Sequence, residues 1–141
     1  MKKDYEEALE QKFVFMQKCR FLTIYDKIGL EVEDGWFPLV FNLCTCIYNL
    51  CKRHQYNPEH IYIKRITEKF GLLNFSYYLI KEDEELNIQI KQAVNRAKEQ
   101  SAHTCQICGD ENAKLENLTF SSMTLCKNCF QELQTRKKSD L

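Results

Sequence analysis

The chain has 141 residues, of which 44% are hydrophobic and 28% are charged, and its twenty basic and twenty acidic side chains cancel at neutral pH. This composition is typical of a globular chain and excludes a disordered or low-complexity one. The charge balance excludes an overall basic protein, so a nucleic-acid surface would need a local arrangement of cations. Neither a secretory leader nor an apolar run of membrane-spanning length is present, which predicts a cytoplasmic protein with reduced cysteines and no membrane partner.

The first two predicted elements are amphipathic helices. Apolar side chains recur at helical spacing over residues 4–22. A polar, glycine-containing connector is expected at 23–35, with a short extended piece at 23–25. The second helix is predicted to begin beside Pro38, because a proline in the first helical turn gives up no hydrogen bond. Its apolar spacing continues to about Gln55.

The second predicted helix also carries Cys44, Cys46, Cys51 and His54. Cys51 and His54 lie one turn apart, which would suit a second metal site. Free cysteine is among the most buried residue types, however, and these residues fall mainly on the apolar face. We therefore favour a core role for them over metal binding.

Residues 61–80 predict a β-hairpin with its bend at 68–71. The first half carries the β-branched residues Ile61, Ile63 and Ile66, and after Gly71 apolar residues alternate with others, as on a strand that buries one face. An acidic run at 82–85 suits the positive end of a third helix. Apolar spacing then predicts that this helix continues to about Gln100.

The strongest motif is Cys105-Gln-Ile-Cys108, separated by seventeen residues from Cys126-Lys-Asn-Cys129. Two Cys-x-x-Cys pairs at this separation predict a tetrahedral site of four thiolates, and we take the metal to be Zn2+. Gly109 allows the tight turn that such a pair needs. A closed four-cysteine site leaves no open coordination position, so the metal is expected to hold structure and to perform no chemistry.

Two disulfides or a redox pair are the alternatives for these cysteines, but nothing in the sequence suggests secretion or a surrounding βαβ unit. His103 could compete as a ligand, although four cysteines already complete the site. Short strands are expected at 118–120 and 123–125, followed by a short helix from Phe130 and a disordered basic end at 136–138.

The predicted fold class is α+β, with amphipathic helices packed on a β-hairpin and a C-terminal four-cysteine zinc ribbon. We expect a division into a helix–helix–hairpin–helix domain over residues 1–100 and a zinc ribbon with a short helical tail over 101–141.

Three separated stretches resemble a family of small, largely uncharacterised proteins that is common in bacteriophage and other mobile genomes. The stretches are Glu33–Phe37 with Leu43 and Cys44, Glu68–Gly71 with Leu73 and Phe75, and Ser101–Gly109 with Thr124–Cys126. In that family an arginine typically stands where this chain has Asn74, and a histidine commonly replaces the last cysteine. The resemblance implies a phage-type origin, hence host cytoplasm, and a metal-binding C-terminal end, without implying an activity.

Catalysis is not expected. The three histidines are His54, His60 and His103, and none of them follows Cys105, where a metal-finger nuclease would need one. No phosphate-binding glycine loop is present, and the acidic run is better explained as a helix start.

Two binding functions remain. The first is a non-catalytic adaptor or inhibitor that binds a host protein or ribonucleoprotein, such as a CRISPR effector in the manner of an anti-CRISPR protein. It would use exposed aromatic side chains, for which the candidates are Trp36, Phe37, Tyr77 and Tyr78. The alternative is a nucleic-acid-binding regulator, in which cations and stacking rings of the hairpin contact a single strand. Its candidates are Tyr62, Lys64, Arg65, Lys69, Tyr77 and Tyr78.

Overall fold

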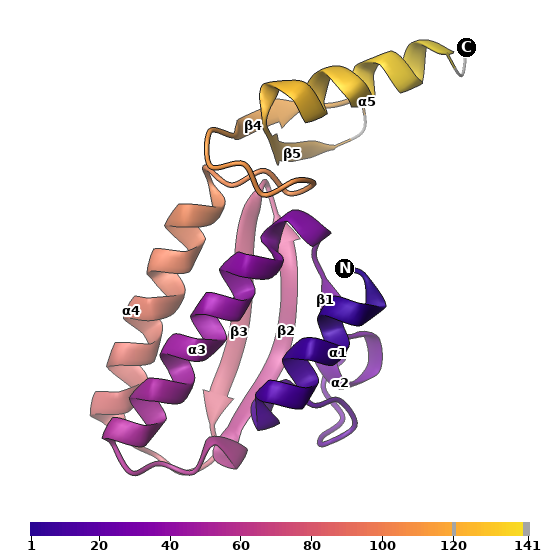
Figure 1. The fold of residues 1–141 in the computed structure, drawn as a ribbon. Helices are drawn as coiled ribbons and strands as arrows, with labels where there is room; N and C mark the ends of the chain where they lie inside the picture. The colour runs from indigo at the N-terminus through magenta and orange to yellow at the C-terminus, as the bar shows by residue number, and fades with distance from the viewer. Residues whose placement is uncertain (120, 140–141) are drawn as a thin grey trace.

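The computed structural model describes residues 1–119 and 121–139, and it is an α+β fold, as the sequence predicts (Figure 1). Its elements, in chain order, are α1 (Lys3–Lys12), α2 (Ile24–Ile28), β1 (Leu30–Glu31), α3 (Phe37–Arg53), β2 (Ile61–Lys69), β3 (Leu72–Leu79), α4 (Glu84–Ser101), β4 (Lys114–Asn117), β5 (Ser122–Leu125) and α5 (Lys127–Ser139). Short 3-10 turns precede α3 and β2 and follow α1.

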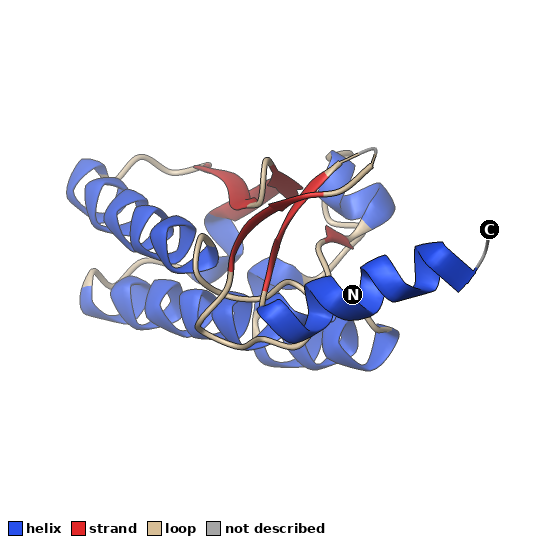
Figure 2. Cartoon of the chain, turned by 90° about the horizontal axis from the view of Figure 1, so that it is seen from above, coloured by secondary structure: helices blue, strands red, loops and turns tan. Residues whose placement is uncertain are grey.

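A three-stranded sheet with the order β1-β2-β3 forms the centre of the larger part. The predicted hairpin is confirmed, since β2 and β3 pair antiparallel from Ile61↔Leu79 to Lys69↔Leu72. The register shifts between Ile63 and Arg65, which marks a β-bulge at Lys64. Seen from above, the hairpin strands form a layer to one side of the long helices (Figure 2).

The main core lies between this sheet and helices α1, α3 and α4. Helix α3 begins beside Pro38, as predicted, and buries one face along its whole length. That face consists of Leu39, Val40, Leu43, Cys44, Ile47, Leu50 and Cys51. Helix α4 begins where Asp83 accepts a hydrogen bond from the backbone N–H of Leu86 (3.0 Å), which satisfies one of the donors that a helix start leaves unpaired.

The predicted helix over residues 4–22 is too long. Helix α1 ends at Lys12, because Phe13 adopts an extended conformation with φ −122° and ψ 116°. Phe13 and Phe15 are both buried, yet two residues apart on a helix they would face nearly opposite sides. The break in the helix lets both rings enter the same core, where they stack with centroids 5.6 Å apart.

The connector also differs from prediction. Residues 24–28 form α2, because the hydroxyl of Thr23 caps this short helix by accepting from the N–H of Asp26 (3.1 Å). The extended piece lies later in the chain, where Leu30 pairs with Ile66 in parallel register. The connector at 23–35 mixes polar, acidic and two glycine positions, so it gave no periodicity from which this two-residue strand could be predicted.

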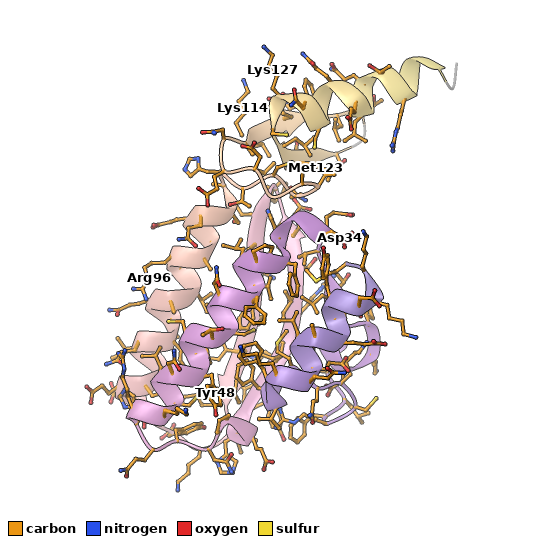
Figure 3. All side chains as sticks on the ribbon, viewed as in Figure 1. Asp34, Tyr48, Arg96, Lys114, Met123 and Lys127 are labelled. Carbon is orange, nitrogen blue, oxygen red and sulfur yellow. The ribbon has the colours of Figure 1, made fainter. Side chains whose placement is uncertain are left out.

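The C-terminal part is a two-stranded sheet covered by α5. The predicted strand at 123–125 is confirmed within β5, but its partner is Lys114–Asn117 and not 118–120. Phe120 of the predicted strand lies outside the described residues. Helix α5 includes residues 136–138, where a disordered end was expected. Figure 3 shows Lys114 and Lys127 at this end of the molecule, and Arg96 on the outer side of α4.

Candidate metal centre

The four motif cysteines come together on two knuckles, which we define as residues 105–109 and 126–129. In the first knuckle the N–H of Gly109 donates to the carbonyl of Cys105 (2.9 Å), and Gly109 has φ +84°, a conformation that favours glycine. The second knuckle joins β5 to the first turn of α5, where the N–H of Cys129 points at the sulfur of Cys126 (3.4 Å).

All four sulfur atoms lie within 4.8 Å of one another, so they could hold a metal ion. A tetrahedral site with metal–sulfur bonds near 2.3 Å requires sulfur–sulfur distances of about 3.8 Å. The sulfurs of Cys108 and Cys126 are 3.6 Å apart, which fits this geometry. His103 is not part of the cluster. Within residues 1–119 and 121–139, no second group of histidine, cysteine and carboxylate side chains is close enough to hold an ion.

The protein environment acts on these thiols in opposite directions. Burial raises the pKa of Cys105, but backbone N–H groups of both knuckles aimed at its sulfur outweigh burial and lower the pKa to about 7. Burial and the neighbouring sulfurs raise the pKa of Cys129. Without a cation, burial and the repulsion between neighbouring thiolates oppose the ionisation of all four thiols. A bound divalent ion would offset that repulsion and favour the thiolate forms.

The first knuckle packs directly on the chain segment that precedes α3. The N–H of Gly35 donates to the carbonyl of Gln106 (2.8 Å), and a Cβ built at Gly35 would lie 2.2 Å from the carbonyl oxygen of Cys105. The indole N–H of Trp36 donates to the carbonyl of Thr104 (2.9 Å). The ligand-bearing loop is thus fixed by hydrogen bonds from residues that lie 68 positions (Trp36 to Thr104) and 71 positions (Gly35 to Gln106) earlier in the chain.

The ribbon also contacts the tip of the hairpin. The hydroxyl of Thr124 donates to the carbonyl of Gly71 (2.6 Å), and Thr124 is itself buried. Its N–H and carbonyl are bonded to the side chain and the backbone of Gln106. The four-cysteine unit is therefore connected to β2 and β3 as well as to α3. Sequence reasoning did not assign these supporting roles to Gly35, Gln106 and Thr124, because the roles depend on tertiary contacts that leave no periodic signal in the sequence.

The cysteines of α3 belong to the main core. Cys44 and Cys51 are both fully buried. Burial raises the pKa of the Cys44 thiol and, together with the nearby Asp83 carboxylate, raises that of Cys51 to about 11. His54 lies near the end of α3, and its Nε2 is 3.0 Å from the side-chain oxygen of Gln89. This agrees with the predicted core role.

The structure corrects the prediction of an exposed Trp36. Its side chain is fully buried and its N–H is bonded to Thr104, so it supports the knuckle and is not available to a partner. Phe37 is half-buried and stacks on Tyr5 with centroids 4.3 Å apart. The expectation failed because an aromatic pair beside a glycine looks the same in sequence whether it is a contact surface or a packing anchor.

The hairpin brings several of its predicted residues to the sheet face away from α3. The ring of Tyr62 stacks on Phe21 (3.4 Å) and contacts Tyr78 (4.5 Å), and the ammonium of Lys64 lies 5.2 Å from the Tyr78 ring. Arg65 forms an ion pair with Glu31 through its Nε (3.0 Å). This face therefore has fewer available cations than its sequence suggests.

Two other predicted residues lie elsewhere on the hairpin. Lys69 is exposed at the turn. The ring of Tyr77 points to the opposite face, where its hydroxyl donates to the side-chain oxygen of Asn87 on α4 (2.8 Å). Burial raises the pKa of Tyr77 to about 12. The six residues proposed for nucleic-acid contact therefore do not form one surface.

None of the helices within the described residues combines the length and the hydropathy that a membrane span requires. No protein-family model, curated protein or solved structure matches the chain.

Proposed function

We propose that this chain is a non-catalytic, zinc-stabilised binding protein that acts by docking on another protein or ribonucleoprotein. The observation that carries the proposal is the closed set of four sulfurs within 4.8 Å of one another. Thiolate ligands in a tetrahedral set favour zinc or an iron–sulfur centre, and the ribbon-like pair of knuckles favours zinc. With four protein ligands, the ion keeps no position for a substrate or a water.

The remaining reactive groups support a role without chemistry. The thiols of Cys44 and Cys51 have raised pKa values, which makes them poor nucleophiles. The ring of His54 is engaged with Gln89. No general base is poised beside a nucleophile in these groups, as covalent catalysis would require.

Exposed apolar side chains support protein docking. Phe70 is 84% exposed at the hairpin turn and has φ +54°, a conformation that is costly for a bulky residue. Leu115 of the ribbon is 51% exposed and lies against the neighbouring Gly71. A large ring kept in a strained and exposed position is typical of a contact residue. The resemblance to phage-borne chains adds the proposal that the partner is a host factor, such as a CRISPR effector, which the protein inhibits.

A nucleic-acid-binding regulator is the second candidate. The contact of Tyr62 with Tyr78, together with Lys64 over the Tyr78 ring, is an arrangement that could stack on a base. Because Arg65 is paired with Glu31, we place this function second.

Native mass spectrometry of the protein as purified, with metal analysis of the same sample, tests the proposal. We expect one zinc per chain and no bound nucleic acid. Affinity capture from host extract then separates the two functions, because phosphate contacts weaken steeply with salt whereas an apolar protein interface does not. Co-purifying RNA that is lost as salt rises would reverse the order of the two candidates.

A further inference from the structure

Strand β3 is an edge strand, because the sheet order is β1-β2-β3. The N–H of Ile80, just beyond β3, donates to the carbonyl of His60 on the β2 side (2.9 Å). The N–H of Leu73 points the other way and donates to the hydroxyl of Ser101 on α4 (2.9 Å). Backbone groups alternate between the two sides of a strand. The even-numbered residues of β3 therefore pair with β2, and the odd-numbered ones face the open edge.

The backbone groups of three residues at this edge have no hydrogen-bond partner within the described residues. The N–H and carbonyl groups of Phe75, Tyr77 and Leu79 face outward, and no hydrogen bond engages them within the described residues. Edge strands are usually protected by charged side chains, by proline, by a bulge or by a covering helix or loop. Helix α4 covers the Leu73 end of this edge through Ser101. The eight residues of β3, LLNFSYYL, contain neither a charge nor a proline, and the bulge of this hairpin lies on β2.

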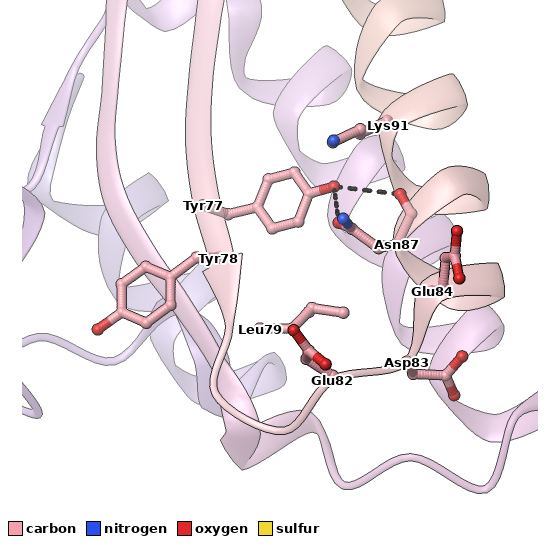
Figure 4. Close-up of a pocket in the computed structure, with 8 residues that line it drawn as sticks. All are labelled: Tyr77, Tyr78, Leu79, Glu82, Asp83, Glu84, Asn87 and Lys91. Carbon is pink, nitrogen blue, oxygen red and sulfur yellow. Dashed lines mark hydrogen bonds between the residues drawn. The ribbon is translucent and has the colours of Figure 1, made fainter.

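A cleft of about 690 Å³ lies beside this open edge, between β3 and the first half of α4 (Figure 4). Tyr77 and Leu79 line it from the strand, and Asn87 and Lys91 line it from the helix. The hydrogen bond from Tyr77 to Asn87 connects its two walls (Figure 4). An added strand would thus find backbone partners along β3 and room for side chains next to it.

The charge of the cleft indicates which side chains it would accept. Glu82 and Glu84 line it, are exposed, and form no ion pair within residues 1–119 and 121–139, whereas Lys91 is the one cation of the lining. Asp83 is already engaged in capping α4. Nearby Ile80 and Ile88 are 47% and 51% exposed and offer apolar contact. The cleft therefore complements a segment with alternating apolar and basic residues.

We propose that an extended basic segment of a partner protein binds as a fourth strand on β3 and places a lysine or arginine side chain in the Glu82–Glu84 cleft. This is strand addition, in which backbone hydrogen bonds supply affinity and pockets for alternate side chains supply specificity. It rests on the proposed protein-docking function and names the surface and the chemistry of its partner.

The probe is a six-residue capped peptide of alternating valine and lysine, titrated into the isotope-labelled, metal-loaded full chain and followed by NMR. We expect shifts and slower exchange at the amides of Phe75, Tyr77 and Leu79. The same peptide N-methylated at alternate residues cannot donate to the edge and is expected to bind about tenfold more weakly. A valine–glutamate peptide is expected to lose binding as well, because it would face Glu82 and Glu84.

Two pairs of variants assign the binding to the edge and to the cleft. Leu79→Pro removes an outward N–H without breaking a bond to β2 and is expected to weaken the lysine peptide about fivefold to tenfold. Leu79→Ala loses the apolar side chain but keeps that N–H, so it is expected to weaken the peptide clearly less than Leu79→Pro does. Glu84→Gln removes one carboxylate and is expected to weaken the lysine peptide, while Glu99→Gln, at the far end of α4, is the matched control.

No binding of the lysine peptide at millimolar concentration, or equal binding of its N-methylated form, overturns the proposal. Protection of the same amides that rises with protein concentration and needs no peptide would assign the edge to a second copy of the chain, which also overturns it. A host protein that is captured equally by wild type and Leu79→Pro would place docking elsewhere and leave the proposed function standing. Capture of nucleic acid alone would remove both.

Discussion

The indole N–H of Trp36 donates a 2.9 Å hydrogen bond to the carbonyl oxygen of Thr104, the residue directly before the first metal-ligand candidate. Trp36 is the single tryptophan of the chain and is fully buried. Its neighbour Gly35 is bonded to Gln106, which lies between two of the four cysteines. The fluorescence of Trp36 therefore reports on the main core and, through its hydrogen bond to Thr104, on the loop that would hold the metal.

Removal of the metal with a strong chelator is expected to change Trp36 fluorescence and to lower the melting temperature of the chain. Without the ion, the knuckle at residues 105–109 loses the metal–sulfur bonds that hold it in place. The hydrogen bonds from Gly35 to Gln106 and from Trp36 to the adjacent Thr104 are then expected to weaken. Each kcal/mol lost is expected to lower the melting temperature by about 2 to 8 °C. Hydrogen exchange should show the largest loss of protection in β4, β5 and α5, a smaller loss at residues 35–36, and little change in β2.

The matched variants for this experiment are Cys108→Ser and Cys19→Ser. Cys108 belongs to the cluster, whereas Cys19 is exposed and lies outside it. We expect Cys108→Ser to reproduce the effect of the chelator and Cys19→Ser to behave as wild type. An unchanged Trp36 signal in Cys108→Ser would show that the knuckle and the core are not coupled.

Gly35→Ala is expected to destabilise the protein by about 2 to 4 kcal/mol, because its Cβ would lie 2.2 Å from the carbonyl oxygen of Cys105. Backbone atoms cannot rotate away as a flexible side chain can, so the knuckle must shift. Urea unfolding of the metal-loaded chain, followed by Trp36 fluorescence, measures the effect. Asn49→Ala on the exposed side of α3 serves as the control. A loss below about 0.5 kcal/mol would mean that the segment before α3 does not support the knuckle.

Seven of the eight cysteines are expected to react with a thiol reagent in three groups. Cys19 is exposed and should react at once. The four clustered cysteines should react only after chelation, since the metal competes for their thiolates. Cys44 and Cys51 are buried with raised pKa values and should react only when the protein unfolds. Mass spectrometry of the labelled chain over time resolves the groups. Early labelling of Cys51 in the folded protein would contradict its core assignment.

How far the sequence predicts this structure depends on the kind of signal that each element carries. The hairpin and helices α3 and α4 have regular alternation or helical spacing, and the ribbon has a cysteine spacing with one dominant explanation. Nothing in the sequence marks the end of α1 before Phe13, because apolar residues continue at helical spacing beyond this position. What ended the helix is a tertiary effect, the burial of Phe13 together with Phe15.

The candidate site divides in the same way. The four ligands follow from their spacing. The contacts that support them join the ribbon to Gly35 and Gly71, which stand 70 and 34 positions before Cys105, the first of the four ligands. Trp36 was expected at the surface because aromatic residues are common in interfaces, but composition does not report burial. The open edge of β3 depends on sheet order, which no local pattern in this chain encodes.

Tyr77 is expected to make stability depend on alkaline pH. Burial raises its pKa to about 12, while a tyrosine in an unfolded chain titrates near 10. The unfolded state therefore loses its proton first, so the contribution of Tyr77 is fully present below about pH 10 and is lost as the pH rises toward about 12. Other buried tyrosines add to the total, so the effect is read as the difference between wild type and Tyr77→Phe.

Tyr77→Phe removes the hydroxyl that donates to Asn87 and is expected to cost about 1 kcal/mol at neutral pH. Above pH 10 this difference should shrink, because wild type then loses the stabilisation from the protonated Tyr77 hydroxyl, which Tyr77→Phe lacks at every pH. The free energies of unfolding are compared by urea unfolding at pH 7, 9 and 11, at a constant temperature of about 298 K. Tyr78→Phe, at an exposed ring, is the matched control and should stay within about 0.5 kcal/mol of wild type at each pH. A difference between wild type and Tyr77→Phe that does not change with pH would show that the phenol ionises equally in the folded and unfolded chains.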